Sequence, residues 1–180
     1  SKNIFMKNFI LLFSLIGLFV SCADNNHTCE VQTNGFITGS DQTIMMGSQA
    51  TVEVFKKFDA AWAVRDYETL KAHIGSGSFI HDDGTITTNG EEFVAKIDNS
   101  YQASLETGED WGWTTNFAYS VKPSASNDPE NTNTQGEWVN ARFTGADGAV
   151  YEEWYQFVEG KLINWSSAKR ELTKAEELKE

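Results

Sequence analysis

The spacing of apolar residues changes near Trp111, and this change constrains the fold more than any other feature of the chain. Upstream of it, apolar side chains recur at the spacing of an amphipathic helix. Downstream, they recur at every second residue, which is the spacing of a strand with one buried face. The chain is therefore expected to place helices before a run of strands.

Three helices and six strands are predicted from these periods and from the turn residues between them. Ser48 and Asp66 are suited to cap the first two helices, and Gly75-Ser76-Gly77 is expected to end the second. The predicted helices span 49–64, 66–74 and 90–105. The predicted strands span 79–82, 85–88, 111–122, 137–144, 150–159 and 161–168.

The last four strands are expected to form an antiparallel meander. Asp147-Gly148 and Glu159-Gly160 are hairpin turn sequences, and Asp83-Gly84 joins the first two short strands in the same way. Residues 123–135 lack large apolar side chains and are expected to form a long exposed loop. Alternation along residues 111–122 predicts that one face of that strand is buried. That face carries Trp111, Trp113, Thr115, Phe117, Tyr119 and Val121.

Residues 1–22 are interpreted as a targeting segment and excluded from the fold. Lys7 precedes a twelve-residue apolar stretch, residues 9–20, which is shorter than the roughly 20 residues that a membrane-spanning helix needs. The sequence FVSC at 19–22 resembles the lipobox of bacterial lipoproteins, although Phe19 stands where that motif usually has Leu. The resemblance implies a lipid-modified Cys22 and a place at the periplasmic face of the outer membrane or at the cell surface. An ordinary signal peptide cut near Ser21 is the alternative.

The acidic charge of the chain argues against two classes of partner. The formal net charge is −12, and removing Lys2 and Lys7 with the targeting segment makes it −14. Nucleic acid is not expected as a partner, because its phosphates bind cationic side chains. The membrane is expected to be contacted only through the acylated Cys22. Residues 23–47 are interpreted as a flexible tether, 48–170 as one domain, and 171–180 as a charged, solvated terminal helix.

Several stretches of the domain resemble the nuclear transport factor 2-like superfamily, which includes SnoaL-like polyketide cyclases and ketosteroid isomerases. These stretches are FDAAWAVRDYETL at 58–70, FIHDDG at 79–84, Gly90, and WYQFVEGKL at 154–162. The resemblance covers about 48–169 and implies a cone-shaped α+β fold with a cavity between a curved sheet and three N-terminal helices. Its motifs are structural, so it implies no particular chemistry.

Two residues near the first hairpin are candidate catalytic bases. His81 alternates with Phe79 and can point inward, and imidazole transfers protons near neutral pH. Asp83 can supply a carboxylate. In this reading, Arg142 or Tyr101 would stabilise developing negative charge. The alternative is a hydrogen-bonded or surface histidine beside an aspartate that only shapes the turn.

The later strands carry candidate ligand-binding residues, but their period does not say which face is inward. Trp138, Asn140 and Arg142 share one face of a strand, and Glu152, Trp154 and Gln156 share one face of the next. If inward, these faces form a polar cavity wall. If outward, the core is formed by the alternate residues Val139, Ala141, Phe143, Tyr151, Tyr155 and Phe157. Tyr101, Trp113, Trp138, Asn140, Arg142, Glu152 and Trp154 are the predicted ligand contacts.

Three functions remain open from the sequence. The favoured one is a lipid-anchored domain that binds an unidentified small molecule without catalysis. The second is an isomerase, cyclase or hydrolase that uses His81 or Asp83, and the third is a homodimer formed through the sheet face. The sequence holds no phosphate-binding glycine loop, nucleophile elbow or paired metal ligands, so no cofactor or metal is predicted.

Overall fold

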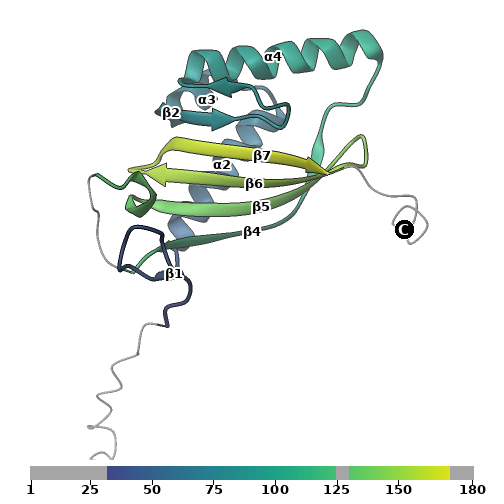
Figure 1. Cartoon of the computed structure of the whole chain (residues 1–180). Helices are drawn as coiled ribbons and strands as arrows, with labels where there is room; N and C mark the ends of the chain where they lie inside the picture. Colours follow the sequence, from purple (N-terminus) through teal and green to yellow (C-terminus); the bar gives the residue numbers. More distant parts are fainter. Residues whose placement is uncertain (1–31, 125–129, 171–180) are drawn as a thin grey trace, which may run out of the picture. The chain divides into compact units, whose positions relative to one another are not determined.

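The structure of this chain is a computed structural model that describes residues 32–124 and 130–170. Three helices pack on a curved, mainly antiparallel sheet, as the sequence predicts, but the sheet has seven strands rather than the six expected (Figure 1). The helices are α2 (Gln49–Ala63), α3 (Tyr67–His73) and α4 (Gly90–Thr107), and η1 (Thr132–Thr134) is a short 3₁₀ turn. The strands are β1 (Ile44–Met46), β2 (Ile74–Ile80), β3 (Ile86–Thr87), β4 (Trp113–Pro123), β5 (Glu137–Gly145), β6 (Val150–Val158) and β7 (Lys161–Arg170).

The sheet order is β1-β4-β5-β6-β7-β2-β3, and this order confirms the predicted meander. Neighbouring strands are antiparallel except β2 and β7, which run parallel. Helix α2 contacts β4 and β5, whereas α4 contacts β2, so the helices cover one face of the sheet (Figure 1). The predicted targeting segment, Cys22 and the terminal helix at 171–180 lie outside the described residues.

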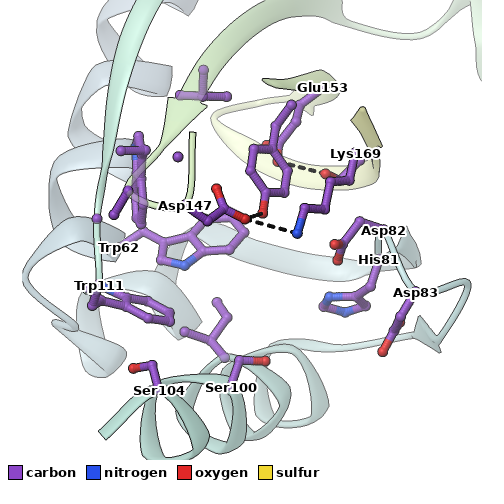
Figure 2. Close-up of a pocket in the computed structure, with 18 of the residues that line it drawn as sticks. Trp62, His81, Asp82, Asp83, Ser100, Ser104, Trp111, Asp147, Glu153 and Lys169 are labelled. Atoms are coloured by element: carbon purple, nitrogen blue, oxygen red, sulfur yellow. Dashed lines mark hydrogen bonds and ion pairs between the residues drawn. The ribbon is translucent and has the colours of Figure 1, made fainter. Parts of the chain in front are cut away.

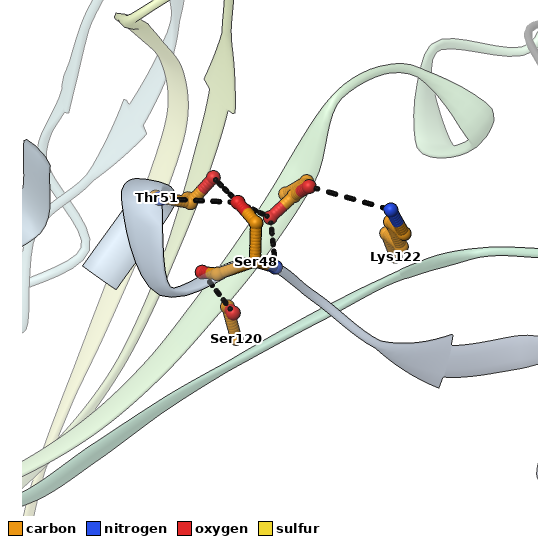
Figure 3. A network of polar contacts seen from close by, with 5 residues as sticks. Ser48, Thr51, Ser120 and Lys122 are labelled. Carbon is orange, nitrogen blue, oxygen red and sulfur yellow. Dashed lines mark hydrogen bonds and ion pairs between the residues drawn. The ribbon is translucent and has the colours of Figure 1, made fainter. Parts of the chain in front are cut away.

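The start of α2 is tied to the sheet by a polar network (Figure 3). Ser48 is the N-cap, and its hydroxyl accepts a hydrogen bond from the Thr51 backbone N–H at 3.2 Å. The Glu137 carboxylate of β5 accepts bonds from the Ser48 backbone N–H at 2.7 Å and from its hydroxyl at 2.9 Å. Ser120 of β4 donates to the Ser48 carbonyl at 3.0 Å. These bonds fix the helix over the sheet and satisfy donors that a helix end otherwise leaves unpaired.

Two predicted irregular segments are more ordered than expected. Within the predicted tether, β1 pairs with the end of β4, and Asn34 forms a bridge with Ile44. In the predicted exposed loop, Thr134 is only 1% exposed, and the Gln156 side chain donates to the Thr132 carbonyl at 2.6 Å. Residues 44–46 of the predicted tether thus form an edge strand, because Ile44, Met45 and Met46 are an apolar segment that pairs with β4.

Gly75-Ser76-Gly77 does not act as a separate helix stop. Helix α3 ends at His73, and β2 begins at once with Ile74, so these glycines belong to the strand. A Cβ on Gly77 would lie 1.7 Å from the Ile163 carbonyl oxygen of β7. Gly77 is required because β2 and β7 approach closely at a register shift between Ile74 and Ser78.

A β-bulge corrects the predicted facing of β4. The register with β5 shifts between Thr115 and Phe117, so the side chains after the shift change sides. Trp113 packs against the core, whereas Phe117 and Tyr119 are each 41% exposed on the opposite face. The uninterrupted alternation predicted for this strand is therefore wrong, because one extra residue reverses the phase.

The core settles which face of β5 and β6 is inward. Val139, Ala141 and Phe143 are buried, as are Tyr155 and Phe157. We call the side that they share with the helices the inner face, and the opposite side the outer face. The second of the two alternatives left open by the sequence therefore holds. Buried aromatic and aliphatic side chains of α2, α4 and β7 complete this core, namely Phe55, Phe58, Phe93, Ile97, Leu162 and Trp165.

Candidate functional site

A pocket of about 700 Å³ lies on the inner face of the sheet (Figure 2). Its walls come from α2, α4, the turn after β2, the segment that enters β4, and strands β5 to β7. The aromatic residues in its walls are Trp62, Trp111, Trp113, Phe143, Tyr151 and Tyr155. A concave site of this size with aromatic walls and a few polar groups is typical of small-molecule binding.

Glu153 of β6 is the most buried acid that lines the pocket. It is 8% exposed and accepts hydrogen bonds from the Trp165 Nε1–H at 3.0 Å and the Ser167 hydroxyl at 2.9 Å. The Tyr155 hydroxyl donates a third bond to the same carboxyl group. Burial raises the pKa of Glu153 to about 7 although these donors oppose the shift, and the charge of Asp59 adds to the increase. Glu153 can therefore exchange a proton near neutral pH.

Asp59 of α2 is a second acid on the pocket wall. The Trp113 Nε1–H donates to its Oδ1 at 2.8 Å, and the Thr115 hydroxyl donates to its Oδ2 at 3.1 Å. Burial raises the pKa of Asp59, and the two donors counteract that increase. Asp59 thus links α2 to β4 and presents a negative charge to the pocket.

His81 lines the pocket near the end of β2, as the alternation with Phe79 predicts. It is 6% exposed, and its Nε2 lies 3.1 Å from the Thr87 hydroxyl. Its ring lies edge-on to Trp165, with 5.0 Å between the ring centroids. Burial, followed by the nearby charge of Lys96, lowers the pKa of His81. The imidazole is therefore neutral at pH 7 and can accept a proton or a hydrogen bond.

Two ion pairs lie among the lining residues. Lys96 of α4 pairs with Asp83. Lys169 of β7 pairs with Asp147 at 2.9 Å (Figure 2). The Tyr151 hydroxyl also donates to Asp147 at 3.2 Å. The Lys96 ammonium and the Thr85 donors hold the pKa of Asp83 well below its usual range. Asp83 is therefore a weak base, and its turn geometry agrees with the turn interpretation made from the sequence.

The fold is shared with solved proteins of low sequence identity. A SnoaL-like protein of unknown function from Burkholderia thailandensis superposes with a TM-score of 0.51 at 12% identity, covering 70% of this chain and 99% of that one. This chain has the nuclear transport factor 2-like fold. A nuclear transport factor 2-like protein of unknown function from Cytophaga hutchinsonii aligns at 7% identity with a TM-score of 0.46, over 70% of this chain and 95% of that one. No protein-family model and no curated protein matches the sequence.

Within this nuclear transport factor 2-like domain, most of the predicted ligand contacts lie outside the pocket lining. His81, Asp83 and Trp113 line the pocket. Tyr101 instead packs behind it, against Trp111 at 5.3 Å and under the Arg65 guanidinium at 4.0 Å. The remaining five lie on the outer face of β5 and β6, where the register pairs Asn140 with Trp154, Arg142 with Glu152, and Trp138 with Gln156. These five are Trp138, Asn140, Arg142, Glu152 and Trp154.

Sequence reasoning missed the two most buried acids of the pocket. Glu153 alternates with Tyr151 and Tyr155, so it is in phase with an aromatic face. Asp59 lies at a core-facing position of α2, next to Phe58. An acid in phase with buried aromatic residues is the signal that could have found both, since such a group must find partners or change its pKa.

The described residues add two further observations. No group of three or more His, Cys, Asp or Glu side chains among residues 32–124 and 130–170 is arranged to hold a metal ion. In the same part of the chain, no helix is long and apolar enough to cross a membrane.

Proposed function

We propose that this domain binds a small organic molecule in its inner-face pocket and is held at the bacterial cell envelope by an acylated Cys22. The observation that carries the binding proposal is the aromatic-walled pocket of about 700 Å³ with the buried Glu153 carboxyl group among its lining residues. Aromatic walls supply contact area, and Glu153, Asp59 and His81 supply a small number of directional polar groups.

Native mass spectrometry of the gently purified domain tests the binding proposal. We expect a bound small molecule that is lost on denaturation. Ser100 of α4 points into the pocket, whereas the adjacent Asn99 is exposed and lies outside the lining (Figure 2). Ser100→Trp is expected to block the pocket and abolish the bound species, and Asn99→Trp is the matched control. A species that survives Ser100→Trp would show that the molecule binds elsewhere.

The lipid anchor is a separate part of the proposal with its own test. Supporting it are the apolar stretch at 9–20 and the sequence FVSC at 19–22. Expression in a bacterium grown with a radiolabelled fatty acid is expected to label the wild-type chain but not Cys22→Ala. An unlabelled wild-type chain that is still exported would favour the ordinary signal peptide, leaving the pocket proposal unaffected.

An acid–base enzyme is the second candidate function, and the Glu153 environment favours it. A carboxyl group with a pKa of about 7 is suited to abstract and return a proton at neutral pH. Glu153 takes the role that the sequence assigned to His81 or Asp83, while His81 can accept a proton as a second group.

Hydrogen exchange into the bound molecule separates catalysis from simple binding. In D₂O, an enzyme of this kind is expected to introduce deuterium at a carbon atom of its ligand, which raises the ligand mass. Glu153→Gln is expected to stop this exchange while retaining the ligand, because the amide cannot accept the proton. Exchange that continues in Glu153→Gln but stops in His81→Ala would assign the base to His81. No exchange in the wild type would leave a binding domain.

A further inference from the structure

We infer that the pocket takes an organic cation, specifically an ammonium compound. This inference rests on the proposed binding function and names the chemical class of its ligand. It is carried by two independent properties of the lining: its charge balance and its aromatic faces.

The first property is the charge balance of the lining. The residues that form the pocket include seven acids but only two lysines. Both lysines are already paired, Lys96 with Asp83 and Lys169 with Asp147. No ion pair within the described residues involves the five remaining acids. These five are Asp59, Asp82, Glu109, Asp110 and Glu153.

The arrangement of these acids extends the negative potential from the rim into the pocket. Asp82, Glu109 and Asp110 are exposed at the rim, whereas Asp59 is partly buried and Glu153 is buried. A cleft lined by one sign of charge concentrates ligands of the opposite sign. An anionic ligand would be repelled, since the two lysines are already engaged by carboxylates.

The second property is the aromatic wall. Trp62 and Trp113 lie edge to face, with ring centroids 6.0 Å apart, and Trp111 lies 6.1 Å from Trp113. All three line the pocket together with Tyr151 and Tyr155. Aromatic faces attract ammonium groups through their negative quadrupoles, most strongly where water is excluded. The wall therefore suits the same ligand charge that the acids favour.

Three probes with one aromatic scaffold test the charge preference. Binding of 2-phenylethylamine, 2-phenylethanol and phenylacetate to the purified domain would be measured by calorimetry at pH 7.5. We expect the amine to bind at least tenfold more tightly than the alcohol, and phenylacetate to bind most weakly. Equal affinity for amine and alcohol, or a preference for phenylacetate, would overturn the cation inference while leaving a binding pocket.

Charge variants at the rim identify the site of binding. Glu109→Gln/Asp110→Asn removes two lining charges from exposed positions, and we expect amine affinity to fall about two- to fivefold, as for exposed charge pairs. Asp41→Asn/Glu106→Gln removes two exposed charges outside the lining and should leave affinity unchanged. Equal losses of amine affinity in both variants would show that the overall charge of the protein, rather than the charge of the lining, causes the effect, and would overturn the inference. Failure of all probes, together with no bound molecule in native mass spectrometry, would overturn the proposed function as well.

Discussion

The two faces of strand β6 carry similar residues in different environments. The outer face presents Glu152 and Trp154, and the inner face presents Glu153 and Tyr155. Glu152 pairs with the exposed Arg142, whereas Glu153 is buried and accepts bonds only from neutral donors. Burial, rather than residue type, therefore raises the pKa of Glu153.

The largest expected contrast lies in stability, between Tyr155 and its neighbour Trp154. Tyr155 is 2% exposed and packs against Phe55 with ring centroids 5.0 Å apart, whereas Trp154 is 38% exposed. Tyr155→Ala is expected to lower the free energy of unfolding by about 3–5 kcal/mol, as for other buried aromatic residues. Trp154→Ala should cost about 1 kcal/mol or less in the monomer. Urea denaturation measures both, and equal losses would contradict the assignment of the two faces.

The next contrast is the pH dependence of stability, which should differ between Glu153→Gln and Glu152→Gln. The pKa of Glu153 rises from the ordinary 4.5 to about 7 on folding. Between these values the folded chain binds a proton that the unfolded chain has released, so stability falls as pH rises through this window. The loss attributable to Glu153 is on the order of 3 kcal/mol at most.

Unfolding curves from pH 4 to pH 8 test this prediction. We expect Glu153→Gln to remove that part of the decline, and Glu152→Gln to keep it. His81 acts in the opposite direction, since its lowered pKa makes stability fall as pH decreases through its titration. Subtracting the free energy of unfolding of Glu153→Gln from that of the wild type at each pH removes the contribution of His81 and leaves that of Glu153. A flat difference curve would mean that folding leaves the pKa of Glu153 unchanged.

The contrast between the faces also marks what could be predicted from sequence. The helices, the hairpin turns and the meander depend on local periods and turn residues, and they are confirmed. The sequence did not show which face of β5 and β6 is inward, because both faces carry aromatic residues. Trp138 and Trp154 lie on one face, and Phe143 and Tyr155 lie on the other. Packing against α2 decides between them, and this is a contact between residues far apart in sequence.

Two local features also escaped prediction for physical reasons. The bulge at Thr115–Phe117 inserts one residue into β4, and these residues include no glycine or proline that would indicate a bulge in the sequence. The raised pKa of Glu153 depends on burial, which outweighs the opposing hydrogen bonds from donors of β6 and β7, chiefly Tyr155 and Trp165. His81 was predicted to line the site because its alternation with Phe79 in a short strand was clear. Glu152 was predicted as a ligand contact instead of Glu153, because the sequence did not show which face of β6 is inward.

Self-association through the outer face is expected to give a smaller effect. Phe117 and Tyr119 are stacked there with ring centroids 6.1 Å apart, and Trp154 lies two strands away, so exposed aromatic area is concentrated at one place. If a second copy covers this patch, Tyr119→Glu should weaken the dimer by about tenfold or more, as for a central interface residue. Ala95→Glu, exposed on α4, is the control. Sedimentation of both variants decides the matter, and a wild type that is monomeric at high concentration would reject the homodimer.

The smallest expected effect is the coupling between Arg142 and Glu152 on the outer face. Their side chains are 45% and 38% exposed, so the coupling energy in a cycle of Arg142→Met, Glu152→Gln and the double variant should be about 0.2–1 kcal/mol. High salt should largely remove it, because exposed charges are screened. A coupling well above 2 kcal/mol that resists salt would require the pair to be shielded from water. If sedimentation also shows a dimer, that result would mean that the outer face is buried as well. The inner face would then be covered by the helices and the outer face by a second copy of the chain.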